Sequence, residues 1–407
     1  MKVLYITNAL THYYNLVLSK LNLEDDIELV CIAPKGNQSY QVGAGVKLTK
    51  DGINFKVIEL EEVRRLYLYS TFKDLARTVG EEKPDIVIVL GETLPAFLFE
   101  PSLKRIMKSR KIALILKDHP FRLLSYPDAL KEIRRSNRVF NSLPPLLNRA
   151  ISLLKLGRIL SRVQLEVKKK SLLLPDAHVN YVDAKDVLYS YGVDYKKVFI
   201  TRNSPDTDSL FVTKEEVKLL PKILPDNPYR LVHVGRLVAW KRVDMLIRAF
   251  SSSQQQHPSA ELLIIGTGPE EVRLKQAATE LNLGESVKFL GGIYEQAELG
   301  QYLNESSLYV LAGMGGLSIN DAMCFGLPIL CSVCDGTEGF LVREGKNGRY
   351  FRGDDMEDLA EKITWFFKNL KTADEMGEVS ERIIRNEVNV HTVINGYKDA
   401  FKYVKGE

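Results

Sequence analysis

The sequence predicts an α/β protein with two doubly wound domains, each a parallel β-sheet covered by helices. Short apolar runs alternate with helix-like segments along the chain, and these runs are apolar on both faces, as buried parallel strands are. The length of 407 residues is too great for one ordinary core. It fits two domains of roughly 150 to 200 residues each.

The apolar runs place the strands. In the first half they are expected at residues 3–7, 27–33, 55–60, 85–91, 112–118, 177–182 and 198–203. In the second half they are expected at 229–235, 260–266, 287–292, 308–313 and 328–332. The stretch 204–228 is rich in Pro, Asp and Ser and is interpreted as a linker. Ligands of such sheets bind beyond the carboxyl ends of the strands, so a cleft between two facing domains is the expected active site.

Composition excludes several classes of protein. With 45% hydrophobic and 27% charged residues, the chain is neither disordered nor fibrous. Its formal net charge of +4 gives no argument for nucleic-acid binding. No apolar stretch reaches the roughly 18 residues of a transmembrane helix, and the N-terminal run suits a first strand better than a signal peptide. A cytoplasmic protein is expected, soluble or peripheral on the inner face of the membrane.

The cysteines indicate neither a disulfide framework nor a metal site. They are Cys31, Cys324, Cys331 and Cys334. Cys331 and Cys334 form a C-x-x-C pair, but no second pair or nearby histidine completes a zinc set. A buried pair of free thiols is therefore favoured over a zinc or redox role.

Two cations follow the first strand of the second half. Arg236 and Lys241, in GRLVAWKRVDMLIRAF, lie just past the end of that strand, where they could meet a diphosphate. The alternative is that both are solvated charges on a helix edge, and charge alone favours it. Their position at a strand end makes the diphosphate-binding interpretation nearly as strong as that of solvated charges.

Glycines follow the next two strands. Gly266 and Gly268 allow a tight turn and close approach to a ligand or to the partner domain, although structural packing explains such a pair at least as well. Gly291 and Gly292 could present their backbone to a flat base, and Ile293 on the same turn is a further donor-side candidate.

The stretch AGMGGLSINDAM joins a glycine-rich turn to a predicted helix. Its glycines free the backbone, so the amides of Gly316, Leu317 and Ser318 can point toward an anion, which the helix dipole also favours. Asp321 can accept hydrogen bonds from vicinal hydroxyls such as those of a ribose, or it can simply be a stabilising charge near a helix N-terminus. The candidates here are Gly315, Gly316, Leu317, Ser318 and Asp321.

Taken in order, these motifs resemble the C-terminal half of glycosyltransferase family 4, a large family of GT-B enzymes. The resemblance runs from about residue 229 to 352 and includes GRLVAWKRVDMLIRAF, IIGTGPEEVRLK, VKFLGGIYEQAEL, GGLSINDAMCFGLPILCS and EGKNGRYF. NSPDTDSLF, at 203–211, resembles the interdomain loop of the family. The N-terminal half agrees loosely, through MKVLYITN, PDIVIVLGE and the strand leading to Asp118 and His119.

The resemblance implies the GT-B fold, with two Rossmann-like domains facing across a cleft. Residues 1–208 would form an acceptor-binding domain and 209–388 a donor-binding domain, with a last helix, 389–407, packing back on the first. The family transfers a sugar from a nucleoside diphosphate sugar, so neither a metal nor another cofactor is expected.

The resemblance also assigns roles to residues. Arg236 and Lys241 match the cations that stabilise the donor diphosphate as it leaves. Residues 316–318 match the amides of the phosphate-binding helix. Asp321 stands where the family has the second Glu of an E-x7-E pair, which holds the ribose.

One position departs from the family pattern. The first Glu of the pair falls at position 313, where this sequence has Gly313. No acidic residue lies between Glu305 and Asp321, so a shift of register does not restore it. In the family that Glu lies beside the transferred sugar and helps to position it, so its replacement by Gly313 bears on the recognition of the donor sugar and on catalysis.

Candidates for the acceptor side lie beyond strand ends of the first half. Asn8, Thr11 and His12 belong to the loop after the first strand, where a purely structural loop is the equal alternative. Glu92 follows another strand, although a helix-start charge is the stronger interpretation. His119 is where the family often places a histidine near the reacting sugar, whereas a lone histidine is more often packed or solvated.

Residues 131–170 combine apolar and basic side chains at near-helical spacing. The apolar positions are Leu146, Leu147, Ile151, Leu154, Ile159 and Leu160, and the basic ones are Arg149, Lys155, Arg158 and Arg162. A basic amphipathic helix of this kind can lie on an anionic membrane surface. The alternative is an ordinary domain helix with a buried apolar face and a solvated basic face.

Together these features predict a glycosyltransferase that moves a sugar from a nucleoside diphosphate sugar to a glycan or lipid-linked saccharide, in polysaccharide or glycolipid biosynthesis, with retention. Catalysis is assigned to His119, Arg236 and Lys241. Two alternatives stay open. One is a GT-B protein that binds a nucleotide or glycan without transfer, as Gly313 suggests, and the other is an epimerase or phosphorylase on the same fold.

Overall fold

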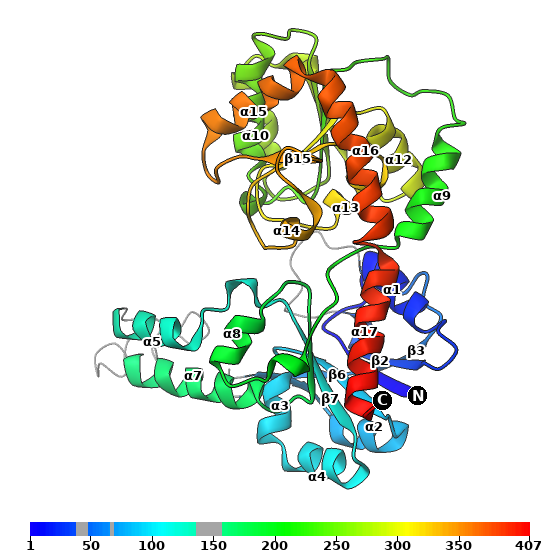
Figure 1. The fold of residues 1–407 in the computed structure, drawn as a ribbon, viewed down its shortest axis with the longest axis vertical. Coiled ribbons are helices and arrows are strands. Elements are labelled where there is room, and N and C mark those ends of the chain that lie inside the picture. The colour runs from blue at the N-terminus through cyan, green and yellow to red at the C-terminus, as the bar shows by residue number, and fades with distance from the viewer. Residues whose placement is uncertain (38–47, 66–68, 136–156) are drawn as a thin grey trace. The chain divides into compact units, whose positions relative to one another are not determined.

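The computed structural model describes residues 1–37, 48–65, 69–135 and 157–407, and these divide into two compact units. Unit 1 consists of Met1–Thr201 and Ile394–Glu407, and unit 2 of Arg202–Val393. Each unit is built on a parallel sheet with helices packed around it (Figure 1). The predicted pair of doubly wound α/β domains is confirmed.

Unit 1 contains a sheet of seven parallel strands in the order β3-β2-β1-β6-β7-β8-β9. The strands are β1 (Lys2–Ile6), β2 (Glu28–Pro34), β3 (Lys56–Leu60), β6 (Ile86–Leu90), β7 (Ala113–Asp118), β8 (Ala177–Asn180) and β9 (Val198–Ile200). The helices are α1 (His12–Leu21), α2 (Leu75–Glu82), α3 (Leu94–Phe99), α4 (Pro101–Arg110), α5 (Tyr126–Arg135), α7 (Gly157–Leu172) and α8 (Lys185–Ser190). An antiparallel hairpin of β4 (Glu62–Arg65) and β5 (Tyr69–Phe72) stands apart from the sheet.

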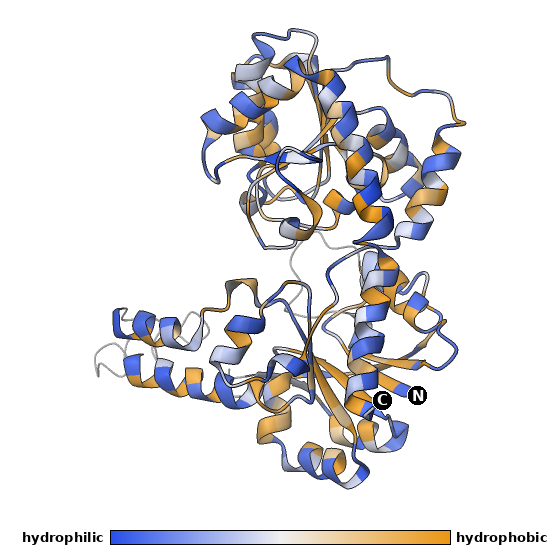
Figure 2. Cartoon of the chain, in the orientation of Figure 1, coloured by the Kyte–Doolittle hydropathy of each residue, from blue (hydrophilic) through white to orange (hydrophobic). Residues whose placement is uncertain are grey.

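The strands of unit 1 form where both faces of the chain are apolar. In β6, the residues from Ile86 to Val89 are fully buried, and they pair with β1 on one side and β7 on the other. β-branched residues suit this position because they pack well on a pleated surface. Figure 2 shows the same division, with hydrophobic strands inside and mixed colouring on the helices around them.

Unit 2 contains six parallel strands in the order β12-β11-β10-β13-β14-β15. The strands are β10 (Arg230–Val234), β11 (Glu261–Ile265), β12 (Val287–Gly291), β13 (Leu308–Leu311), β14 (Ile329–Cys331) and β15 (Gly348–Tyr350). The helices are α9 (Thr207–Val217), α10 (Val243–Gln254), α11 (Glu271–Glu280), α12 (Gln296–Asn304), α13 (Ser318–Cys324), α14 (Glu338–Leu341), α15 (Met356–Lys368) and α16 (Leu370–Asn386).

Each sheet has a point where the strand order reverses. In unit 1 the reversal lies between β1 and β6, and in unit 2 between β10 and β13. In open α/β sheets, the loops that follow two such neighbouring strands diverge to opposite sides of the sheet, and ligands bind between them beyond the carboxyl ends. Asn8 and Glu92 lie in such loops of unit 1, whereas Lys241 and Gly313 lie in those of unit 2.

The interpretation of 204–228 as a linker was wrong over α9. The side chain of Asp206 accepts a hydrogen bond from the Ser209 amide at 3.3 Å and caps this helix. Leu210 and Val217 are buried on its inner face. The Asp and Ser residues that indicated a linker are therefore the start signal of a helix, since capping residues and loop residues are of the same types.

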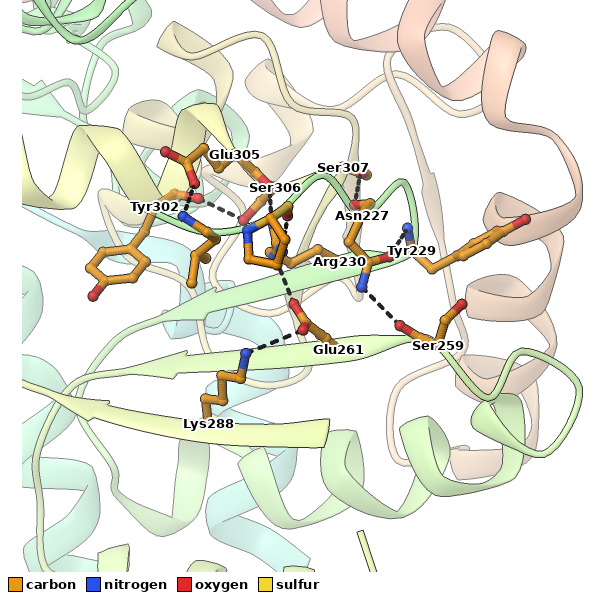
Figure 3. Close-up of polar contacts among 12 residues, drawn as sticks. Asn227, Tyr229, Arg230, Ser259, Glu261, Lys288, Tyr302, Glu305, Ser306 and Ser307 are labelled. Atoms are coloured by element: carbon orange, nitrogen blue, oxygen red, sulfur yellow. Dashed lines mark hydrogen bonds and ion pairs between the residues drawn. The ribbon is translucent and has the colours of Figure 1, made fainter. Parts of the chain in front are cut away.

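The segment between α9 and β10 is fixed to the amino-terminal edge of the unit 2 sheet by Arg230 (Figure 3). Its guanidinium is 1% exposed and donates to Glu261 at 2.7 Å, to the Pro225 carbonyl at 2.6 Å and to the Glu305 carbonyl at 2.7 Å. Lys288 shares the Glu261 carboxylate at 3.2 Å. A buried charge with this many partners joins the segment, β10 and β11 into one structure.

Replacing Arg230 with alanine is expected to lower the free energy of unfolding of the protein by about 3 kcal/mol. The substitution leaves two carbonyls without this donor, and the largely buried Glu261 carboxylate keeps only Lys288 of its two cationic partners. Urea denaturation measures the change. Arg248→Ala, on the exposed face of α10, is the control and should shift stability by less than about 0.5 kcal/mol. Equal effects of the two substitutions would contradict the structural role of Arg230.

The final helix, α17 (Val390–Lys405), contacts unit 1 through residues 394–407. The hydroxyls of Tyr397 and Tyr14 lie 2.7 Å apart, and the ammonium of Lys405 pairs with Asp85 at 3.0 Å. The C-terminal end of the chain is therefore part of the first unit.

Candidate active site

Lys241 is buried at the switch point of unit 2. It closes the short turn η4 (Ala239–Lys241) after β10 and is only 6% exposed. Its ammonium donates hydrogen bonds to the carbonyl oxygens of Met314, at 2.8 Å, and Gly315, at 2.6 Å. A lysine side chain thus ties the loop after β10 to the loop after β13.

A second cation accompanies Lys241. The guanidinium of Arg236 lies 5.7 Å from the centre of the Trp240 ring, on the same loop. Burial, together with the positive charge of Arg236, lowers the pKa of Lys241 to about 8, and the carboxylate of Asp335 opposes the shift. Two cations on one loop make the segment after β10 suitable for binding an anion.

The glycine-rich turn does lead into a helix, α13, as predicted. Among the residues that the structure describes, the amides of Gly316, Leu317 and Ser318 donate to no carbonyl or side chain. The Ser318 hydroxyl, in contrast, lies 2.6 Å from the hydroxyl of Tyr309. The three amides remain free to bind an anion at the positive end of the helix.

Asp321 lies on the same short helix. Its half-buried carboxylate makes no hydrogen bond or ion pair within the described part of the chain, and burial raises its pKa to about 7. An acid that is desolvated without a partner is a candidate for a functional group, although structural networks also shift pKa values. The alternative interpretation, in which Asp321 is a solvated charge near a helix N-terminus, does not fit the desolvation of its carboxylate.

The two shifted pKa values predict the pH dependence of the candidate site. Asp321 carries its charge above pH 7 and Lys241 carries its charge below pH 8. If both charged forms are needed, kcat/KM for a sugar nucleotide should peak between these values and fall on either side, since kcat/KM reports groups of the free enzyme. Asp321→Asn should remove the fall on the acid side. A flat profile from pH 6 to 9 for the native protein would contradict these roles.

Gly313 has no room for a side chain. A β-carbon there would lie 2.3 Å from the carbonyl oxygen of Trp240 and 2.5 to 2.6 Å from the carbonyl group of Lys241. Because these atoms are backbone, they cannot turn away. The glutamate expected at position 313 is therefore excluded by the path of the η4 turn, which packs directly on Gly313.

The other glycines are explained by contacts between neighbouring strand-end loops. A β-carbon on Gly266 would lie 1.9 Å from the carbonyl oxygen of Gly235, and one on Gly268 would lie 2.2 Å from that of Leu237. These glycines permit a close approach of the backbone of the loop after β10. A role for them in donor binding stays a prediction. Ile293 is partly buried against the core of the unit.

Unit 1 brings two of its candidates together. The side-chain amide of Asn8 donates to the Glu92 carboxylate at 2.7 Å, at the switch point between β1 and β6. His119 is exposed after β7, and its amide donates to the Asp118 carboxylate at 2.8 Å. These side chains form a polar rim at the carboxyl edge of the sheet.

The remaining unit 1 candidates lie at the start of α1. Thr11 precedes the helix without a side-chain capping bond, and His12 is its first residue. Sequence reasoning missed Lys117 nearby, which is buried at the end of β7 with its ammonium 3.6 Å from the centre of the Tyr14 ring. Burial holds its pKa well below the usual range.

Part of the basic amphipathic segment is described as α5 and α7, whereas residues 136–156 lie outside the described residues. On α7, the apolar side chains of Ile159 and Val163 are 61% and 53% exposed, one helical turn apart. Arg158 and Arg162 flank them and are exposed as well. No helix in the described ranges is long and apolar enough to cross a membrane.

The described residues contain no group of three or more His, Cys, Asp or Glu side chains that could hold a metal ion. All the cysteines are free thiols, and Cys331 is buried while Cys334 is half-buried. The thiol of Cys334 donates to the carbonyl oxygen of Gly313 at 2.9 Å.

Comparison with known proteins finds a family match in the second half of the chain. Residues 218–382 match the model described as glycosyl transferases group 1. An uncharacterized glycosyltransferase of Haemophilus influenzae is 27% identical over 171 residues, which cover 41% of this chain and 47% of the relative. The amylovoran biosynthesis glycosyltransferase AmsK of Erwinia amylovora is 27% identical over 175 residues, which cover 39% and 41%. The chain thus spans less than half the length of these two relatives.

Among solved structures, Anabaena Alr3699/HepE in complex with UDP has a TM-score of 0.67 at 16% identity, covering 99% of this chain and 100% of that one. A second structure of the same protein contains UDP-glucose. The two doubly wound units and this likeness define the chain as a protein of the GT-B fold. Within that fold, the part of the chain that matches the glycosyl transferases group 1 is residues 218–382.

Proposed function

We propose that this protein transfers a sugar from a nucleoside diphosphate sugar to a glycan or lipid-linked saccharide, in polysaccharide or glycolipid biosynthesis. The observation that carries the proposal is the buried Lys241 ammonium at the switch point of unit 2, beside Arg236 and the unbonded amides of 316–318. The family match and the UDP complexes of HepE support a nucleotide donor.

In the proposed reaction, the bond between the anomeric carbon and the β-phosphate oxygen breaks, and a bond to an acceptor hydroxyl oxygen forms. The proton of that hydroxyl passes to an oxygen of the departing diphosphate. Negative charge grows on the departing diphosphate. Lys241, Arg236 and the helix-start amides meet that charge from fixed positions, which stabilises the transition state. Asp321 accepts hydrogen bonds from the ribose hydroxyls.

Unit 1 supplies the acceptor side in this proposal. As the family resemblance implies, His119 is assigned to the reacting sugar, and the Asn8–Glu92 pair, with Thr11 and His12 on the same rim, is assigned to acceptor hydroxyls. The family resemblance supports retention of the anomeric configuration, which proton NMR of the product determines. Because two cations meet the diphosphate, no metal is required, and turnover should persist in EDTA.

A donor screen tests the proposal. The full chain is incubated with UDP-, GDP- and ADP-hexoses and with crude lipid and glycan fractions as acceptors, and release of the nucleoside diphosphate is measured. One donor should be consumed in an acceptor-dependent manner. No turnover with any donor, alongside tight binding of a nucleotide, would instead favour the alternative of a binding protein without transfer.

The proposal includes a peripheral site on an anionic membrane. The two exposed apolar side chains on α7, Ile159 and Val163, are each preceded by an exposed arginine, which suits insertion at a charged lipid surface. Vesicles of phosphatidylglycerol and phosphatidylcholine should co-sediment the protein at low salt and release it at high salt. The double variant Ile159→Asp, Val163→Asp should bind much less. Absence of salt-sensitive co-sedimentation of the native protein would defeat this part of the proposal.

A further inference from the structure

The loop after β14 is the neighbour of the loop that contains Gly313. β13 and β14 are parallel neighbours, with Leu311 opposite Cys331, so the loops that follow them leave the sheet side by side. The Cys334 thiol donates to the Gly313 carbonyl, which fastens the second loop to the first. The loop after β14 therefore lies next to the position that lacks its acid.

That loop brings a carboxylate to the glycine-rich turn. A β-carbon on Gly315 would lie 2.5 Å from Oδ2 of Asp335 and 3.0 Å from its Oδ1. The carboxylate thus covers the backbone of Gly315, and the absence of a side chain there makes room for it. On the same residue, the carbonyl oxygen accepts the Lys241 ammonium. The Asp335 carboxylate and the Lys241 ammonium therefore both lie against the backbone of Gly315.

The Asp335 carboxylate is held in place through only one of its two oxygens. Its Oδ1 accepts hydrogen bonds from the Thr337 amide, at 3.0 Å, and the Thr337 hydroxyl, at 2.5 Å. Its Oδ2 accepts none from the residues that the structure describes. The next acid along the chain, Glu338 at the start of α14, is 2% exposed, and its carboxylate accepts hydrogen bonds from the amides of Cys334, Asp335 and Gly336. Asp335 alone on this loop offers an oriented, accessible oxygen.

We propose that Asp335 recognises the transferred sugar, with Oδ2 accepting a hydrogen bond from a hydroxyl of the hexose on a nucleoside diphosphate hexose. This assignment rests on the proposed function and deepens it. Asp335 then supplies from the loop after β14 the carboxylate that the E-x7-E pattern would supply from position 313. Thr337 is a positioning residue, since it acts through Asp335.

Calorimetric titration tests the assignment with UDP, GDP and ADP and with UDP-glucose, GDP-mannose and ADP-glucose. The native protein should bind one nucleotide and its sugar form. Asp335→Asn should bind the bare diphosphate within about twofold of native but the sugar nucleotide about 10-fold or more weakly, because a hydrogen bond to a charged group is lost. Asp226→Asn, at an exposed carboxylate whose partner is Lys222, is the control and should bind both forms as the native protein does.

Thr337→Val provides a second variant, which keeps the carboxylate but removes one bond that orients it. It should weaken binding of the sugar nucleotide in the same direction by a smaller factor, and it decides the matter if Asp335→Asn does not fold. Equal weakening of the bare and sugar forms, or weakening of neither, overturns the role of Asp335 and leaves the proposed function standing. A native protein that binds none of the six compounds overturns the proposed function and this assignment with it.

Discussion

Replacing Lys241 with methionine is expected to lower kcat for sugar transfer by roughly 10²- to 10³-fold, the usual effect of removing one fixed donor from a developing negative charge. The side chain is nearly as long as lysine and stays compatible with a buried position. What is lost is the ammonium, which lies between the loops after β10 and β13. Steady-state kinetics with the donor identified by the screen measure the effect.

Arg236→Ala should act in the same direction, since its guanidinium is the second cation of the loop. Lys346→Ala, which removes an exposed cation elsewhere in unit 2, is the matched control and should leave turnover unchanged. Thermal melting of each variant separates a catalytic loss from unfolding, because Lys241→Met also leaves two carbonyl groups without a donor. Normal turnover in both Lys241→Met and Arg236→Ala would contradict the diphosphate assignment.

Restoring the family glutamate by Gly313→Glu is expected to reduce activity rather than improve it. The new side chain would collide with the backbone of Trp240 and Lys241, so the η4 turn would have to move. Overpacking of this kind costs typically about 1 to 3 kcal/mol of stability. It would also displace Lys241 from the carbonyls to which it donates. Urea denaturation and donor turnover measure the two effects.

Gly339→Glu is the control for that substitution. It adds the same side chain and charge in unit 2, at a glycine whose β-carbon would meet no atom within 4 Å. Stability should change by less than about 0.5 kcal/mol, as for most surface substitutions. A Gly313→Glu variant with native stability and higher turnover would show that the site accepts the family pattern and that Asp335 is not its replacement.

The strands could be predicted because a strand that is buried on both faces has a continuous run of apolar residues in the sequence. The apolar runs at 85–91 and 260–266 are of this kind, and they contain β6 and β11, each of which pairs with a strand on both sides. β15, with the sequence GRY, and the β4–β5 hairpin have no such run and were missed. They are short and lie at an edge or outside the sheet, where pairing is decided by tertiary contacts rather than by the pattern of hydrophobic residues.

The candidate site could be predicted only where a motif lies on one continuous segment. Lys241 and Asp321 were found because each follows a strand in a recognisable local pattern. Asp335 was missed because its relevance depends on Gly315, which is on a different strand-end loop. The structure also explains why position 313 is a glycine. The turn that carries Lys241 fills the space where a side chain would be.

The most direct test of the account is a crystal structure of the protein with the nucleoside diphosphate hexose that it binds. The account predicts the diphosphate against Lys241, Arg236 and the amides of 316–318, the ribose hydroxyls on Asp321, and a hexose hydroxyl on Asp335. A nucleotide bound away from the carboxyl ends of β10 and β13, or one whose diphosphate contacts neither Lys241 nor Arg236, would contradict it.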